Sequence, residues 1–196
     1  MNVGLYFGSF NPIHTGHLII ASHVLNESGL DRVWFVVSPH NPFKPSPSLL
    51  NEYDRLHLVQ KAIENDSRLR ATDIEFNLPR PSYTIHTLTY LKEKYPDHNF
   101  SIIMGSDSFQ NIEKWKNADL LLRDYEFMVY RRPGFEITDG GKARLKIMTA
   151  PLLEISATHI RELVRTGKSI KYLVPQIVED EILSMNFYKR SNQHPK

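Results

Sequence analysis

The ten residues Gly8–His17 read GSFNPIHTGH and join an apolar run to a helical pattern. The run, Val3–Phe7, has the composition of a buried strand, and the apolar residues after the turn recur at helical spacing: Leu18, Ile19, Ala21, Val24 and Leu25. One strand-to-helix turn therefore holds glycines, an aromatic residue, a proline and two histidines. Such a turn presents backbone N–H groups and the positive end of a helix to an anion. It predicts an α/β fold with an anion site after the first strand.

The two histidines of the turn, His14 and His17, are three residues apart and fall on one face of the first helical turn. There, two imidazoles can donate hydrogen bonds to a phosphate. The spacing H-x-x-H also suggests a metal pair, but helical metal pairs more often use positions i and i+4, and no third ligand is near in the sequence. We therefore expect a phosphate site and no protein-bound metal.

Further apolar segments alternate with helical patterns along the chain. Strands are predicted at Val33–Val37, Phe100–Met104, Phe127–Tyr130 and, more weakly, Ile147–Thr149. Helices are predicted at Leu49–Ile63, Thr84–Tyr95, Ile160–Val164 and Ile177–Met185, and a short apolar helix or turn is predicted at Asp119–Arg123. Proline-containing loops are predicted at Ser38–Ser48, Leu78–Ser82 and Arg131–Gly141. Because the strands are continuously apolar, we predict a Rossmann-like α/β fold, a doubly wound parallel sheet with helices on both faces.

Length and composition restrict the number of domains and the kinds of ligand and site that this protein can have. The 196 residues suit one domain, predicted over residues 1–188 and followed by a polar tail at 189–196. The formal net charge of +2 predicts no general affinity for nucleic acid or acidic membranes. The absence of cysteine excludes disulfides, thiolate metal sites and cysteine nucleophiles. No apolar run approaches the length of a membrane span, so we expect a cytoplasmic protein.

A second anion-binding pattern lies near the C-terminus, where residues 155–161 read ISATHIR. Ser156 and Thr158 are N-cap candidates for a helix that begins near His159. Arg161 stands one turn into that helix, with a guanidinium fork suited to phosphate oxygens. Alone, the pattern describes a capped helix with a surface arginine. It indicates a ligand site because a second such helix start occurs in the same chain.

These motifs resemble those of a known family. GSFNPIHTGH is similar to the G-x-F-x-P-x-H-x-G-H signature of the nucleotidyltransferase superfamily, and ISATHIR is similar to its I-S-S-T-x-I-R signature. The segments between them, RPSYTIHTL (80–88), GSDSFQNIEKW (105–115) and RRPG (131–134), resemble the bacterial nicotinate mononucleotide adenylyltransferases. The chain departs from the usual pattern at Phe43, where the family commonly has histidine, and at Arg80, which precedes Pro81 without the family's glycine.

The resemblance implies that ATP and nicotinate mononucleotide give deamido-NAD and pyrophosphate, with Mg²⁺ bound through the ATP phosphates and the C-terminal helices closing the nucleotide site. It implies catalytic roles for His14, His17, Lys44 and Arg161. It implies ATP contacts from Gly8, Ser9, Phe10, His14, His17, Gly105, Asp107, Ile155, Ser156, Thr158 and Arg161. It implies acceptor contacts from Lys44, Ser82, Tyr83, Thr84, Asp107, Trp115 and Arg132.

Three alternatives stay open at this point. The acceptor can be nicotinamide mononucleotide or phosphopantetheine, although RPSYTIHTL with GSDSFQNIEKW argues against both. The chain can also be a non-catalytic nucleotide-binding module, which would bind ATP without releasing pyrophosphate. A homo-oligomer is compatible with the sequence.

Overall fold

The computed structural model describes the chain except residues 40–48, 138–142, 150, 152 and 190–196. The described strands are β1 (Asn2–Gly8), β2 (Arg32–Val37), β3 (Leu69–Thr72), β4 (Asn99–Gly105), β5 (Glu126–Tyr130) and β6 (Arg144–Met148). The described α-helices are α1 (Thr15–Ser28), α2 (Glu52–Ile63), α3 (Thr84–Lys94), α4 (Ser106–Phe109), α5 (Ala118–Asp124), α6 (Ala157–Arg165) and α7 (Gln176–Ser184). Two 3₁₀ helices, η1 (Ile74–Asn77) and η2 (Ile112–Lys114), complete the described elements.

The described strands form one parallel sheet in the order β3-β2-β1-β4-β5-β6. The chain builds outward from β1 through β2 to β3, and then returns to pair β4 with the other edge of β1. This reversal places a topological switch point between β1 and β4, where open α/β sheets bind ligands beyond the carboxyl ends of their strands. The predicted doubly wound sheet is confirmed.

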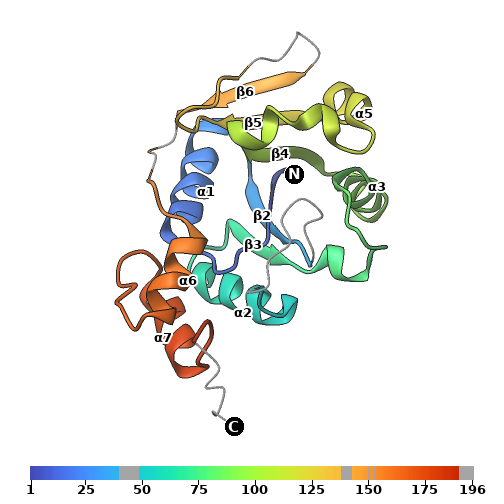
Figure 1. Cartoon of the computed structure of the whole chain (residues 1–196). Helices are drawn as coiled ribbons and strands as arrows, with labels where there is room; N and C mark the ends of the chain where they lie inside the picture. The colour runs from blue at the N-terminus through green and yellow to red at the C-terminus, as the bar shows by residue number, and fades with distance from the viewer. Residues whose placement is uncertain (40–48, 138–142, 150, 152, 190–196) are drawn as a thin grey trace.

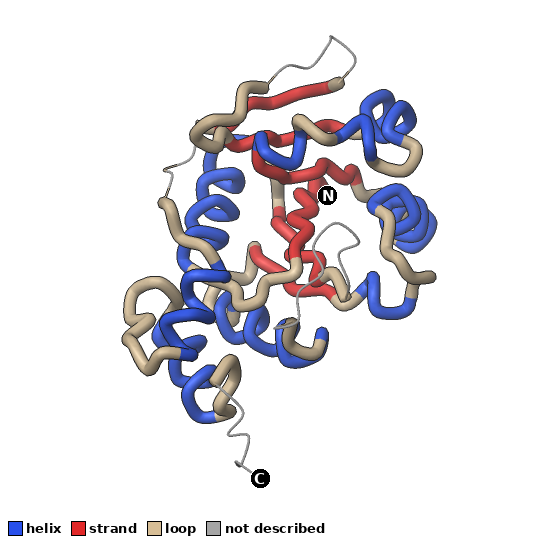
Figure 2. The backbone as a smooth tube through the Cα atoms, in the orientation of Figure 1, coloured by secondary structure: helices blue, strands red, loops and turns tan. Residues whose placement is uncertain are grey.

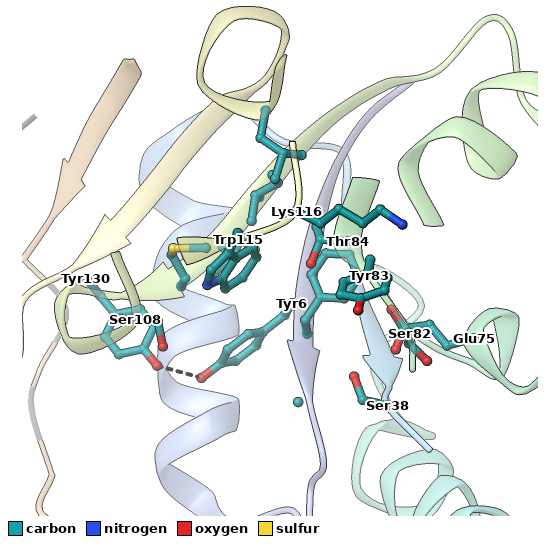
Figure 3. Close-up of a pocket in the computed structure, with 17 residues that line it drawn as sticks. Tyr6, Ser38, Glu75, Ser82, Tyr83, Thr84, Ser108, Trp115, Lys116 and Tyr130 are labelled. Atoms are coloured by element: carbon teal, nitrogen blue, oxygen red, sulfur yellow. Dashed lines mark hydrogen bonds between the residues drawn. The ribbon is translucent and has the colours of Figure 1, made fainter. Parts of the chain in front are cut away.

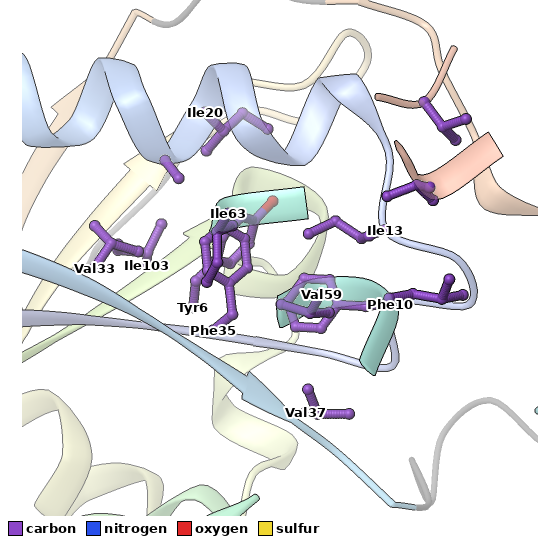
Figure 4. Packing of buried hydrophobic residues seen from close by; sticks show 14 of the residues in the cluster. Tyr6, Phe10, Ile13, Ile20, Val33, Phe35, Val37, Val59, Ile63 and Ile103 are labelled. Carbon is purple, nitrogen blue, oxygen red and sulfur yellow. The ribbon is translucent and has the colours of Figure 1, made fainter. Parts of the chain in front are cut away.

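Helices cover both faces of the sheet (Figures 1 and 2). On one face lie α1, α2, α6 and α7, and on the other lie α3 and α5. Strand β2 shows how the sequence serves both layers, because its side chains alternate between two buried clusters: Val33, Phe35 and Val37 face the first layer, and Trp34 and Val36 face the second. Figure 4 shows the packing of the first cluster. Burial on both faces explains why the strands read as continuous apolar runs.

The structure corrects the sequence analysis at several element boundaries. Strand β3 and the short helices η1, η2 and α4 were not predicted. Strand β6 begins at Arg144, three residues before the predicted start, and α2 begins at Glu52 after its cap Asn51, whose Oδ1 accepts the Tyr53 N–H at 2.9 Å. Most of the predicted loop 38–48 and of the polar tail lies outside the described residues. None of the helices in the described part of the chain has the length and apolar character needed to cross a bilayer.

Candidate active site

The turn between β1 and α1 is shaped by a glycine and an aromatic ring. A Cβ atom on Gly8 would lie 2.9 Å from the Phe10 ring, so glycine lets this buried ring fold back over the strand end. The C-terminal part of the chain docks on the same turn, since the Thr15 N–H donates to the Leu173 carbonyl at 2.9 Å. The C-terminal part of the chain therefore lies against the β1–α1 turn, as predicted for helices that close this site.

The histidine pair stands where α1 begins. His14 is the N-cap residue, and its ring stacks on that of His17 with centroids 3.6 Å apart. The His14 backbone N–H donates to His17 Nδ1 at 3.2 Å. Because Nδ1 accepts this bond, the neutral His17 ring carries its proton on Nε2.

Burial keeps both imidazoles neutral. Burial, with a smaller contribution from the Arg132 cation, lowers the pKa of His14 to about 4. Burial, His14 and Arg132 together lower the pKa of His17 well below its usual value. At neutral pH each ring therefore offers one N–H donor without a positive charge of its own.

The start of α6 faces the same turn. Ser156 is the N-cap residue, and its Oγ accepts the His159 N–H at 3.1 Å. Arg161 Nη1 donates to the Asn11 carbonyl at 2.8 Å, and its Nη2 donates to Thr158 Oγ1 at 3.2 Å. The guanidinium thus links α6 to the β1–α1 turn across 150 residues of sequence.

A cavity of about 510 Å³, here called the histidine cavity, opens between these two helix starts. Among its lining residues are Gly8, Ser9, Phe10, His14, His17, Asp107, Arg132, Ile155, Ser156, Thr158 and Arg161. All were singled out from the sequence, so the structure brings the two distant motifs together.

A second cavity of about 170 Å³, here called the tryptophan cavity, lies at the carboxyl ends of β1 and β4 (Figure 3). Four predicted acceptor residues line it: Ser82, Tyr83, Thr84 and Trp115. Tyr83 is the N-cap of α3, so the unpaired N–H groups of the first helical turn start at this cavity. Lys116 also lines it, with Nζ 4.6 Å from the centre of the Tyr83 ring. The cavity therefore combines aromatic faces with a positively polarised end.

The two cavities share five lining residues: Tyr6, Phe7, Gly8, Ser108 and Tyr130. Tyr6, Phe7 and Gly8 are the last three residues of β1, Tyr130 is the last residue of β5, and Ser108 lies in α4 just after β4. All five are therefore close to the switch point of the sheet. At the boundary the Tyr6 and Tyr130 hydroxyls lie 3.2 Å apart, as Figure 3 shows. The cavities are thus two halves of one cleft.

Two predicted residues line a different cavity from the rest of their predicted group. Arg132, predicted as an acceptor contact, lines the histidine cavity, while Gly105, predicted as an ATP contact, lines the tryptophan cavity. Asp107, predicted to contact both substrates, lines the histidine cavity. Arg132 Nε lies 3.1 Å from Asp107 Oδ1, and its backbone N–H donates to Ser106 Oγ at 2.8 Å. A Cβ on Gly105 would meet both partners of this ion pair, which explains the glycine. Lys44 lies outside the described residues.

A buried arginine in α2 connects the loops that border the cleft. Arg55 is fully buried in α2 and donates to the carbonyls of Ser9, Ser38, Pro39 and Leu50, at 2.6, 2.8, 3.0 and 2.9 Å. Its fork thereby ties the loops after β1 and β2 to the start of α2.

Sequence comparison identifies the family of this fold and cleft. The pattern of the cytidylyltransferase-like family matches residues 5–163. The probable nicotinate-nucleotide adenylyltransferase of Cytophaga hutchinsonii is 51% identical over 189 residues, which are 96% of this chain and 98% of that protein. The protein of the same name from Flavobacterium psychrophilum is 47% identical over 97% of this chain and 100% of its own length. This chain belongs to the nicotinate-nucleotide adenylyltransferase family.

Solved structures agree with the architecture of this family. The Plasmodium falciparum nicotinic acid mononucleotide adenylyltransferase complexed with NaAD matches with a TM-score of 0.80 at 22% identity, over 95% of this chain and 97% of that one. The same enzyme complexed with APC matches with a TM-score of 0.79 at 22% identity, over 95% and 96% of the two chains. At this identity the likeness shows the shared fold.

Several cleft residues of this adenylyltransferase-family chain were not predicted from its sequence. Tyr6, Tyr130 and Ser108 lie at or just beyond strand ends, so the rule that ligands bind at carboxyl ends of parallel strands could have found them. Lys116 directly follows the predicted Trp115. Glu75, which lines the tryptophan cavity from η1, had no signal, because the sequence analysis assigned no element to its segment.

Proposed function

We propose that this protein transfers the adenylyl group of ATP to nicotinate mononucleotide, giving deamido-NAD and pyrophosphate. The observation that supports it best is the meeting of two cavities at Gly8, one lined by phosphate-binding helix starts and the other by aromatic residues. If ATP occupies the histidine cavity and nicotinate mononucleotide the tryptophan cavity, the phosphates of the two substrates would meet at the boundary between the cavities. The names of the bacterial relatives agree with this reaction.

The triphosphate of ATP would lie in the histidine cavity. His14 and His17 would donate to the α- and β-phosphate region from the start of α1. Ser156, Thr158 and Arg161 would hold the β- and γ-phosphates at the start of α6, where the helix dipole favours an anion. The role of Lys44, which lies outside the described residues, stays a prediction of the resemblance.

The chemical step needs positioning and charge stabilisation rather than a base. An oxygen of the acceptor phosphate attacks the α-phosphorus of ATP in line, and the bond from that phosphorus to the pyrophosphate oxygen breaks. The nucleophile is already an anion, so no proton must be removed. Neutral N–H donors on His14 and His17 would stabilise the charge that develops on the phosphate oxygens.

The nicotinate end of the acceptor would lie in the tryptophan cavity. Trp115 offers a face for the ring to stack on. The N–H groups at the start of α3, at Thr84, and the Lys116 ammonium suit a carboxylate. Two N–H donors aimed at carboxylate oxygens leave no acceptor for an amide NH₂ at the start of α3, so the acid should be preferred over the amide there.

Magnesium would enter with ATP as part of that substrate. Within the described residues, no group of three or more His, Asp or Glu side chains is placed to hold a metal ion. Mg²⁺ would therefore be held by phosphate oxygens and water. It would neutralise phosphate charge when bound. The homo-oligomer and the cytoplasmic location stay predictions.

The experiment that tests this function is a pyrophosphate-release assay with ATP and Mg²⁺. Nicotinate mononucleotide and nicotinamide mononucleotide are compared side by side. We expect a strong preference for the acid. Equal use of both would contradict the account of carboxylate recognition, and release only with phosphopantetheine would assign a different acceptor. ATP binding without any release would indicate a binding module.

A further inference from the structure

Unpaired buried atoms mark places where a ligand completes the structure. Three of these atoms in the described residues line the cleft: His14 Nδ1, Glu75 Oε2 and Ser82 Oγ. A buried polar atom that lacks a hydrogen bond destabilises a protein, and buried carboxylates are rarely left so. The first belongs to the histidine cavity. Glu75 Oε2 and Ser82 Oγ belong to residues that line the tryptophan cavity.

Glu75 is held rigidly, with one oxygen engaged and the other unused. It lies in η1 with 2% of its surface exposed. Its Oε1 accepts a hydrogen bond from Thr87 Oγ1 of α3 at 2.8 Å, while Oε2 is buried without a hydrogen bond. Burial raises the pKa of this carboxyl, and the nearby Thr87 and Ser38 hydroxyls lower it by smaller amounts. Figure 3 shows Ser38, Glu75 and Ser82 gathered at one end of the tryptophan cavity. The unused carboxylate oxygen therefore belongs to the wall of a ligand cavity.

The chemistry of the proposed acceptor limits what can pair with this oxygen. A carboxylate oxygen needs a hydrogen-bond donor. In nicotinate mononucleotide the ring carboxylate and the phosphate accept hydrogen bonds, and the ring nitrogen is bonded to the sugar and has no proton. The two ribose hydroxyls are its dependable donors. The ring carboxylate is better matched by the Lys116 ammonium, which lines the same cavity.

We propose that Glu75 is a specificity-determining residue that binds a ribose hydroxyl of the acceptor nucleotide through Oε2. The Ser82 hydroxyl lies beside Glu75 in the cavity wall and donates a hydrogen bond to an oxygen atom of the same ribose. This assignment takes its acceptor from the proposed function. It extends that function by naming the group that distinguishes a ribonucleotide acceptor from its deoxy analogues.

Calorimetric titration of the protein with nicotinate mononucleotide and with its 2′-deoxy and 3′-deoxy forms tests the assignment. For the wild type, at least one deoxy form should bind about ten- to hundredfold more weakly, because it leaves the Glu75 carboxylate buried and unpaired. Glu75→Leu has a similar size and no acceptor, so this variant should bind all three acceptors with nearly equal affinity.

Thr87→Val provides the matched control. Thr87 bonds the other oxygen of Glu75 but does not line the cavity. If Glu75 acts only by holding α3, then Thr87→Val and Glu75→Leu should change the titrations alike. Our proposal expects Thr87→Val to keep the wild-type penalty for the deoxy acceptor.

A second variant keeps the proposal testable if Glu75→Leu does not fold. Glu75→Gln replaces a charged hydrogen bond with a neutral one, so the penalty for the deoxy acceptor should fall to about two- to tenfold. Equal binding of all three acceptors by the wild type would overturn the assignment, as would an unchanged penalty in Glu75→Gln. Binding without pyrophosphate release would instead contradict adenylyl transfer and leave the role of Glu75 intact.

Discussion

At the scale of single residues, the environment of the two histidines decides their chemistry. An exposed imidazole at a helix start would be partly protonated near pH 6.5 and would attract phosphate by charge. Here the rings of His14 and His17 are both buried and close to Arg132, and each feature lowers the pKa and favours the neutral form. For His17 the stacked His14 ring lowers the pKa further. The positive charge of the site then comes from arginine and the helix ends. The neutral imidazoles contribute N–H groups that donate hydrogen bonds in a fixed direction.

His17→Ala tests the catalytic role of the second histidine. Removing one preorganised donor typically costs about 10²–10³ in rate, and we expect a loss of that size in kcat for pyrophosphate release. His23→Ala, on the same helix α1 and absent from the lining of both cavities, is the control and should keep normal turnover. Near-normal turnover of His17→Ala with an unchanged circular dichroism spectrum would remove this residue from the mechanism.

His14 should make the stability of the free protein depend on pH. Its pKa falls from 6.5 to about 4 on folding, so the unfolded chain binds the proton more tightly in that window. The free energy of unfolding should therefore decrease as pH falls from 6.5 toward 4, by on the order of 3 kcal/mol from this residue. His14→Asn, which keeps a good N-cap side chain, should show a shallower decrease in urea titrations. Parallel curves for the two proteins would contradict the buried neutral state.

At the scale of elements, burial on both sheet faces made β1, β2, β4 and β5 readable from their apolar runs. The missed strand β3 (Leu69–Thr72) is a short edge strand with only Thr72 buried, so hydrophobicity did not mark it. Strand β6 is the other edge, and its first residues, Arg144 and Lys146, have polar ends that reach solvent or neighbouring carbonyls. Edge strands need less apolar sequence, because one side of their backbone has no neighbouring strand to bury it.

The cap of α6 provides a test at this scale. Ser156→Ala removes the hydrogen bond to the His159 N–H and should lower the free energy of unfolding by about 1 kcal/mol. Thr158→Ala, at the second residue of the helix, leaves the cap intact and should change the free energy of unfolding by less than about 0.5 kcal/mol. Urea unfolding of both variants gives the comparison. Equal losses would show that Ser156 does not act as the cap.

At the scale of the whole molecule, the sheet topology assembles one cleft from segments far apart in the chain. The turn after β1, the segments after β4 and β5, the start of α3 and the start of α6 all reach the switch point. Apart from the five residues that the two cavities share, each half of the cleft is lined by its own set of side chains. The halves should therefore be separable by mutation.

Two variants test this separation. Trp115→Ala should raise KM for nicotinate mononucleotide about tenfold by removing a stacking face, with little change in KM for ATP. Arg161→Ala should raise KM for ATP with little change in KM for nicotinate mononucleotide, since Arg161 lines the histidine cavity. Steady-state kinetics with each substrate varied in turn gives both constants, so each variant controls for the other. Equal effects on both KM values in Trp115→Ala would argue against ring stacking.

The sequence by itself determined the strand–turn–helix at Gly8–His17, the alternation of strands and helices, and a helix start capped by Ser156 or Thr158. These features depend on local spacing and on the burial preference of each residue, both of which a single chain reveals. Only the tertiary structure decided that Arg161 contacts Asn11, that Tyr6 meets Tyr130, and that Asp107 and Arg132 face the histidine cavity. It also decided that Glu75 is left with an unpaired oxygen in the cleft. Such relations join residues far apart in the chain, and no periodicity encodes them, because buried polar partners are set by how the layers pack.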